Sequence, residues 1–160
     1  MKRFLVLGAC GAIHPLVRIL DIVVPTWGIR EEGTSYHYLP PHVVPKPSER
    51  IVEILRRELD PVARGLGAGL HLGGVWSTDA VYRETRDKVR RYSEMNALCV
   101  DMESTALMSV AMYRGVELGI ALIVTDELHG EKWRFCRDRE RAELLEREVT
   151  RALLEALAKA

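Results

Sequence analysis

The sequence has few cysteines, no excess charge of either sign and no long apolar run, and each shortage excludes a class of protein. Its three cysteines form no C-x-x-C pair, so a disulfide framework or zinc site is not expected and a reducing cytoplasm is the expected compartment. Lys and Arg total 23, as do Asp and Glu, which leaves no net positive charge to attract nucleic acid. No stretch approaches the ~20 apolar residues of a membrane span. We therefore expect a soluble protein with no nucleic-acid or membrane partner.

The remaining composition is that of an ordinary globular protein, with 48% apolar and 29% charged residues. A chain of 160 residues is long enough to bury a core of its own, and no repeat or linker divides it, so residues 1–160 are expected to form a single domain. The five histidines are never four residues apart, the spacing that places two ligands on one helix face. No metal site is expected.

Short apolar runs alternate along the chain with segments of helical periodicity. The runs predict strands at residues 4–8, 21–29, 69–79, 97–100 and 119–127. The periodic segments predict one helix that is capped by Ser48 and ends before Pro61, and others at residues 84–95, 102–114 and 137–159. This alternation predicts an α/β fold, a sheet flanked by helices that binds ligands at the carboxyl ends of its strands.

The residues that follow the predicted strands are small, hydroxyl-bearing or acidic. They are Gly8 to Gly11, Ser77 to Asp79, Asp101 to Glu103, and Thr125 with Asp126. Small residues allow a ligand to approach the backbone closely, and acids and hydroxyls could converge on a polar ligand. The structural alternatives are a turn for the glycines and helix or turn caps for the aspartates.

The segment VDMES, residues 100–104, places two carboxylates at the start of a helix of small and apolar residues. Acidic side chains are favoured in a first helical turn because they interact with its unpaired N–H groups and with the helix dipole. A capping role accounts for Asp101 and leaves Glu103 unexplained.

Four segments, GACGAIHPLVRILDIVVP, STDAVY, VDMESTAL and IVTDE, occur in an order and at separations that resemble the purine nucleoside phosphorylase and uridine phosphorylase family. Enzymes of that family cleave the bond between a nucleobase and ribose. The resemblance extends from Phe4 into the last predicted helix and implies a mixed central sheet. It also implies a nucleoside as substrate, inorganic phosphate as co-substrate, no cofactor and a homo-oligomer.

The resemblance implies roles for individual residues. Glu103 matches the glutamate that accepts hydrogen bonds from the ribose hydroxyls, where a carboxylate stabilises the positive charge that cleavage builds on the sugar. Met102 matches the methionine that packs against the sugar. Asp126 matches the aspartate that protonates N7 of a departing purine, which favours purines over uridine. Arg139 is expected to assist this acid, with Arg137 as the alternative. Further nucleoside contacts are expected from Gly11, Thr78, Val81 and Thr125, and backbone contacts to phosphate from Ala9 and Cys10.

Three positions depart from the family pattern. Val6 stands where phosphorylases carry an arginine, Ala9 where they carry serine or threonine, and Val81 where an aromatic side chain stacks on the base. An arginine is a bidentate anion ligand, and valine cannot replace it. The departures at Val6 and Ala9 favour a nucleosidase that uses water as an alternative to phosphorolysis.

The chain also begins where the family is already well into its sheet. We therefore expect an N-terminally truncated version of the fold, without the family's glycine-rich phosphate loop and with one sheet edge unpaired. This expectation keeps a third interpretation open, a non-catalytic nucleoside-binding or assembly module that needs a complementing N-terminal chain.

Overall fold

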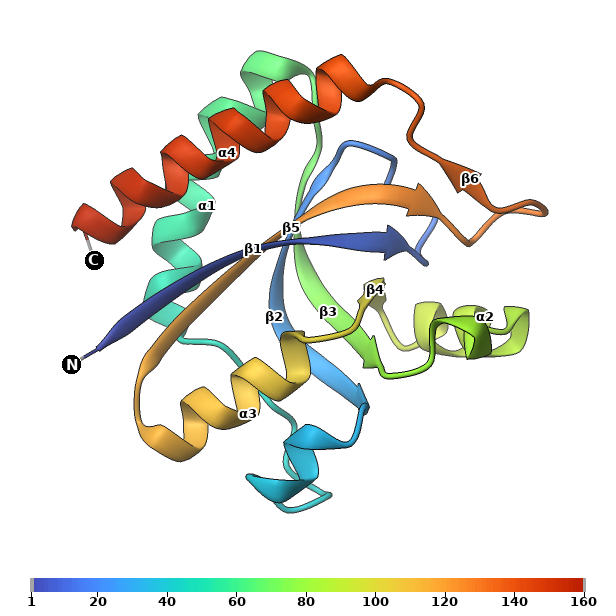
Figure 1. The fold of residues 1–160 in the computed structure, drawn as a ribbon, viewed down its shortest axis with the longest axis vertical. Coiled ribbons are helices and arrows are strands. Elements are labelled where there is room, and N and C mark those ends of the chain that lie inside the picture. The colour runs from blue at the N-terminus through green and yellow to red at the C-terminus, as the bar shows by residue number, and fades with distance from the viewer. Residues whose placement is uncertain (1, 160) are drawn as a thin grey trace.

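A computed structural model describes residues 2–159 as one strongly twisted mixed sheet with helices packed on both of its faces (Figure 1). The strands are β1 (Arg3–Ala12), β2 (Ile22–Glu31), β3 (Leu70–Thr78), β4 (Ala97–Asp101), β5 (Glu117–Glu127) and β6 (Arg134–Phe135). The α-helices are α1 (Glu49–Leu66), α2 (Arg86–Glu94), α3 (Ser104–Arg114) and α4 (Arg139–Lys159). Two short 3-10 helices, η1 (Thr34–His37) and η2 (Val81–Arg83), complete the elements.

The strand order is β1-β4-β3-β2-β5-β6, and β1 also pairs with β5, so the sheet curls round upon itself. Parallel pairing joins β1 to β5, β2 to β3 and β3 to β4. Two pairs are antiparallel: β4 with β1, and β5 with β2. The predicted α/β fold with a mixed central sheet is confirmed. Only Gly11 and Ala12 of β1 pair with β4, so among the described residues the rest of that edge of β1 has no strand beside it.

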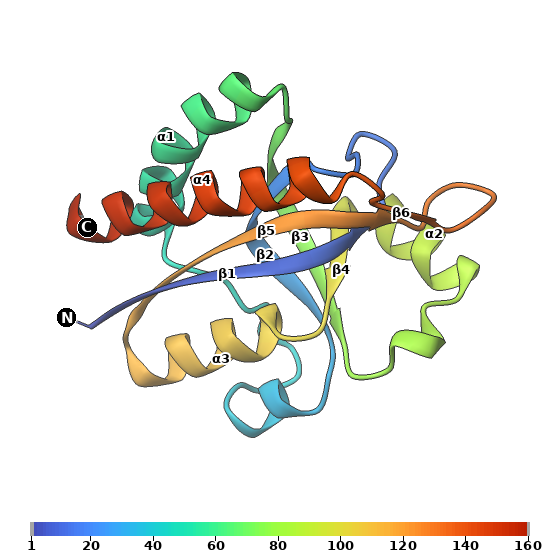
Figure 2. The same ribbon diagram turned by 45° about the horizontal axis from the view of Figure 1, so that its top comes forward.

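The apolar core lies in layers on the two faces of the sheet (Figure 2). Helices α1 and α4 cover one face, where Leu55 and Leu145 are buried among side chains of β2 and β5. Helix α3 covers the other face, where Met108 is buried beside Val75 and Ile120. Among the residues described, no helix is both long and apolar enough to cross a membrane.

The first helix differs from the prediction at both of its ends. Helix α1 continues through Pro61 to Leu66 and ends at Gly67, whose φ of 61° is left-handed. Proline removes one helical hydrogen bond, but burial of Leu59 and Ala63 on either side holds the helix together. Ser48 does not cap the helix with its side chain, because its hydroxyl accepts a hydrogen bond from the Leu118 N–H at 3.2 Å. The strands and the other helices agree with the prediction to within a few residues, and the short strand β6 was not predicted.

Candidate functional site

A cavity of about 320 Å³ opens where β1, β4 and β5 end. It brings together residues that are distant in sequence: the last residues of β1, the segment after β3, the start of α3 and the end of β5. The lining residues are Ala9, Cys10, Gly11, Val81, Glu84, Val100, Asp101, Met102, Glu103, Thr125, Asp126 and Trp133. The prediction that residues following several strands surround one pocket therefore holds for most of the positions named.

The pairing of β1 with β5 sets the position of Asp126. The register shifts after Cys10, so that Gly11 lies opposite Asp126 and Thr125 is the extra residue of a bulge. A bulge redirects side chains at a strand end. A Cβ atom at Gly11 would lie 3.1 Å from Oδ2 of Asp126 and 2.4 Å from Leu128. Gly11 therefore leaves the space in which the Asp126 carboxyl lies.

Asp126 is held by hydrogen bonds at both of its carboxyl oxygens. The indole N–H of Trp133 donates to Oδ2 at 2.5 Å, and the hydroxyl of Thr125 donates to Oδ1 at 3.0 Å. Trp133 comes from the hairpin between β5 and β6, where its ring packs against Phe135 with centroids 4.1 Å apart. Its side chain is 56% exposed and forms part of the cavity wall.

Asp101 and Glu103 differ in role although they are two residues apart. Asp101 is buried, and its carboxyl accepts hydrogen bonds from the Ser77 hydroxyl and from both the N–H and the hydroxyl of Ser104. Burial raises the pKa of Asp101 above its usual range, although the hydrogen bonds from Ser104 and Ser77 oppose the shift. The predicted capping role of Asp101 is confirmed, because it binds the first N–H of helix α3.

Glu103 is exposed and caps no N–H of helix α3 with its side chain. Partial burial, followed by the nearby charge of Asp101, raises the pKa of the Glu103 carboxyl. Met102, which is 42% exposed, lies beside it in the cavity wall. Both side chains are thus exposed in the cavity wall.

Glu84 is the fourth acidic residue of the cavity wall and comes from the segment after β3. Its side chain is half-buried, and burial together with the charge of Asp126 raises its pKa to about 7. Sequence reasoning missed both Glu84 and Trp133. The one available signal was an acid and an aromatic residue in loops that follow strand ends, which is too common a pattern to select them.

Comparison with known proteins shows the family of this chain. The sequence profile of the phosphorylase superfamily matches residues 1–158. The chain belongs to this family. It is 30% identical over 128 residues to a guanosine phosphorylase of Halorubrum lacusprofundi, and 28% identical over 130 residues to a DeoD-type purine nucleoside phosphorylase of Bacillus cytotoxicus.

These alignments cover 80% of this chain but 52% and 53% of the two phosphorylases, so the chain spans about half the length of the curated relatives that it matches. The solved structure of the P. knowlesi homologue of P. falciparum PNP is similar with a TM-score of 0.76 at 23% identity. That match covers 98% of this chain and 63% of the other, and it supports the phosphorylase-superfamily fold.

Two predicted site residues lie elsewhere in this member of the superfamily. Thr78 is 1% exposed, does not line the cavity, and accepts a hydrogen bond from the Ala80 N–H at 3.2 Å, because β3 turns its side chain inward at the strand end. Arg139 is the exposed first residue of α4 and does not line the cavity either. Its alternative, Arg137, lines a different hollow. The β5–β6 hairpin brings Phe135 back beside Asp126, and the two arginines follow in the segment that leads into α4.

The lining of the cavity carries acidic side chains and no basic ones. None of its twelve lining residues is Lys, Arg or His, whereas four of them are carboxylic acids. Val6, where the family resemblance implies an arginine, packs against the apolar core. Cys10 is fully buried, and burial raises the pKa of its thiol well above the usual range. The lining therefore offers no cationic side chain to an anion.

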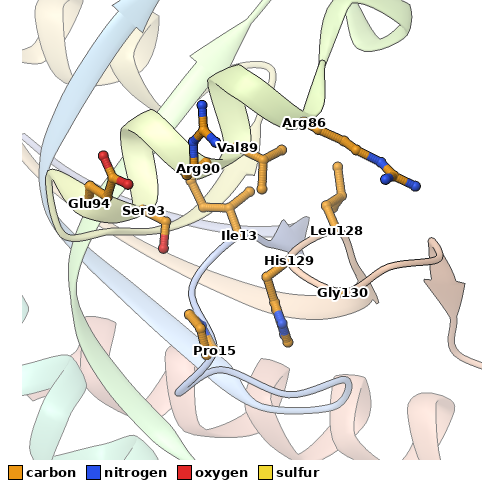
Figure 3. A pocket seen from close by; sticks show the side chains of 10 residues that line it. All are labelled: Ile13, Pro15, Arg86, Val89, Arg90, Ser93, Glu94, Leu128, His129 and Gly130. Carbon is orange, nitrogen blue, oxygen red and sulfur yellow. The ribbon is translucent and has the colours of Figure 1, made fainter.

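A second hollow of about 310 Å³ lies behind the loop that follows β5 and shares no lining residue with the first (Figure 3). His129 lies in its wall, and its Nε2 atom is buried without a hydrogen-bond partner among the described residues, 3.8 Å from a carboxyl oxygen of Glu127. In Figure 3, the guanidinium groups of Arg86 and Arg90 point away from His129. The polar groups of this hollow therefore do not converge on one point.

Proposed function

We propose that this chain cleaves the N-glycosidic bond of a purine nucleoside, with phosphorolysis as the reaction. The observation that carries the proposal is that Glu103 and Asp126 line one cavity from different elements. The Glu103 carboxyl is free to bind the sugar, and the Asp126 carboxyl is held in place to act on the base. The named phosphorylases among the relatives support the same reaction class.

The proposed role of Glu103 is to bind the ribose diol. As the glycosidic bond stretches, positive charge builds on the ribose ring, and a fixed carboxylate stabilises that charge more strongly than it stabilises the ground state. Met102 packs against the apolar face of the sugar. Gly11 and Thr125 complete the surface around it.

The proposed role of Asp126 is to protonate N7 of the purine. The electron pair of the glycosidic bond then stays on the base, which leaves as a neutral molecule. The Trp133 indole is only a donor, and it binds Oδ2. The Thr125 hydroxyl, which can donate or accept, lies at Oδ1. This arrangement supports Oδ1 as the oxygen that carries the transferable proton. Val81 and Trp133 supply the apolar surface for the base.

Cationic side chains bind phosphate strongly, and the lining of this cavity has none. We propose that the anion ligands come from a second copy of the chain or from a complementing N-terminal chain. The edge of β1 before Gly11, which has no strand beside it among the described residues, is a candidate attachment surface. An edge of this kind favours pairing with another strand.

The acidic lining also favours a second candidate function. A nucleosidase uses water as the nucleophile and needs no phosphate site, and a cavity with four carboxylic acids attracts no anion. The sugar and base roles stay the same in this reaction. We further propose that residues 1–160 act as one domain in the cytoplasm and serve purine salvage.

The test is incubation of the purified 160-residue chain with inosine and with guanosine, with and without phosphate, followed by chromatography of the products. Free base together with ribose 1-phosphate, formed only when phosphate is present, supports phosphorolysis. Free base with free ribose, at a rate independent of phosphate, supports the nucleosidase instead. Absence of both base release and nucleoside binding would contradict both and leave a non-catalytic module.

A further inference from the structure

The geometry points to Glu84 as a positioning residue for the proposed reaction: it shares with Asp126 the proton that the departing purine takes up. This inference rests on the proposed function and adds a residue to it. No sequence motif selected Glu84, and its position in the cavity is the starting point.

Glu84 lies directly after η2, where its N–H donates to the Val81 carbonyl at 3.2 Å. Its side chain lines the Asp126 cavity and also an adjoining hollow of about 340 Å³. Val81 and Trp133 are the other residues common to both walls. Glu84 is therefore at the same end of the cavity as the indole that holds Asp126.

No cationic side chain forms an ion pair with Glu84 among the described residues. Its carboxyl makes no hydrogen bond or ion pair there, although it is half-buried. Arg86 is the one cationic residue lining the adjoining hollow, and its guanidinium donates to the Glu131 carbonyl at 2.8 Å. An uncompensated carboxylate in such a place is unfavourable and tends to retain a proton.

The other titratable groups in the two walls do not relieve this charge. The turn before α3 contributes Asp101 and Glu103, η2 contributes Tyr82, and the hairpin after β5 contributes Glu131. Asp101 and Glu103, which line the Asp126 cavity with Glu84, are negative when ionised, and like charges in one cavity oppose a further ionisation. The raised pKa of Glu84, about 7, agrees with a proton that is held near neutrality.

The proposed step is balanced in protons and electrons. The bond from C1′ to N9 breaks, its electron pair stays on the base, and Asp126 transfers its proton to N7, so that a neutral purine leaves. Glu84 then returns a proton to the Asp126 carboxylate through solvent water in the cavity, because the two carboxyls make no direct hydrogen bond, and recovers one from solvent. The ribosyl carbon is taken by the nucleophile, phosphate or water.

The variant that tests this step is Glu84→Gln, which keeps the size of the side chain and removes its acid. Inosine needs a proton at N7, whereas 7-methylinosine already carries positive charge on that ring and needs none. With inosine at pH 7.5 we expect kcat to fall roughly tenfold, KM to change little, and the alkaline limb of the pH profile to move to lower pH. With 7-methylinosine we expect no change. An equal loss with both nucleosides, or an unmoved pH profile, would overturn the inference.

Glu131→Gln is the matched control, because it removes an acid from the adjoining hollow whose side chain does not line the Asp126 cavity. It should leave both substrates unaffected, whereas Glu84→Asp should recover part of the inosine rate.

A carbon-13 NMR titration of the carboxyl groups tests the pairing without any turnover. Glu84 should titrate near pH 7 in the wild-type chain and at lower pH in Asp126→Asn. A titration of Glu84 that does not respond to Asp126→Asn would overturn the inference even if the chain is active. Conversely, coupled titration in a chain that releases no base would refute the proposed function and leave the carboxyl pair established.

Discussion

The indole N–H of Trp133 donates a 2.5 Å hydrogen bond to Oδ2 of Asp126, so a residue of the β5–β6 hairpin orients the acid at the end of β5. The family resemblance had assigned this supporting role to an arginine further along the chain. In this protein the hairpin supplies an aromatic donor to Asp126.

Trp133→Phe removes the N–H and keeps an aromatic ring in the cavity wall. Hydrogen bonds to charged groups contribute about 1.5–3 kcal/mol, so we expect kcat/KM for inosine to fall roughly tenfold or more as Asp126 loses its fixed orientation. Steady-state kinetics measures this change. Phe135→Leu, which alters the neighbouring ring and leaves the hydrogen bond intact, should have a much smaller effect. Equal losses in the two variants would show that the ring, not the N–H, is what matters.

Glu103→Gln should weaken binding of ribonucleosides, because an amide accepts from the two ribose hydroxyls less strongly than a carboxylate does. The loss of charge-assisted hydrogen bonds corresponds to about 1.5–3 kcal/mol, or roughly 10- to 100-fold in Kd. Isothermal titration calorimetry with inosine and 2′-deoxyinosine measures the difference. The variant should discriminate less between the two nucleosides than the wild type does, and unchanged discrimination would argue against a diol contact.

Asp101→Ala should destabilise the fold, in contrast to Glu103→Ala two residues away. Removing the buried carboxyl leaves the donors of Ser77 and Ser104 without their acceptor, and we expect a loss of about 3 kcal/mol in the free energy of unfolding. Glu103 is exposed and caps no helix N–H with its side chain, so its replacement should cost no more than about 0.5 kcal/mol. Urea denaturation of both variants measures the two changes in the free energy of unfolding. Similar losses would mean that the acidic segment acts as a structural unit.

Glu84 should make stability depend on pH. Its pKa in the folded chain is about 7 against 4.5 for an ordinary glutamate, because burial and Asp126 disfavour its charge. The folded state therefore binds the proton more tightly, and the contribution of Glu84 to stability is lost as pH rises from about 4.5 through 7. Glu84→Gln should be more stable than the wild type at pH 8, with a smaller difference at pH 5. Thermal unfolding at the two pH values measures this, and a difference that does not grow with pH would contradict the assignment.

The sequence predicted those features that depend on local pattern. Apolar runs located the five long strands, and the rule that ligands bind beyond strand ends selected Gly11, Glu103 and Asp126, which the fold brings into one cavity. The capping role of Asp101 followed from its place in a first helical turn.

The missed features depend on tertiary geometry. Helix α1 passes Pro61 because its buried side chains outweigh the local penalty. Thr78 is buried at the end of β3, and Arg139 begins helix α4 outside the cavity, after a hairpin that periodicity does not reveal. Trp133 and Glu84 reach the site from loops, where spacing carries little information about direction.

Release of hypoxanthine from inosine by the wild-type chain and by Asp126→Asn, measured side by side with inosine binding to both, tests the central claim most directly. The proposed mechanism predicts base release by the wild type, a rate roughly 100-fold lower in the variant through loss of the general acid, and similar inosine affinity in the two. Equal rates of base release, or a wild-type chain that neither binds inosine nor releases its base, would contradict the account.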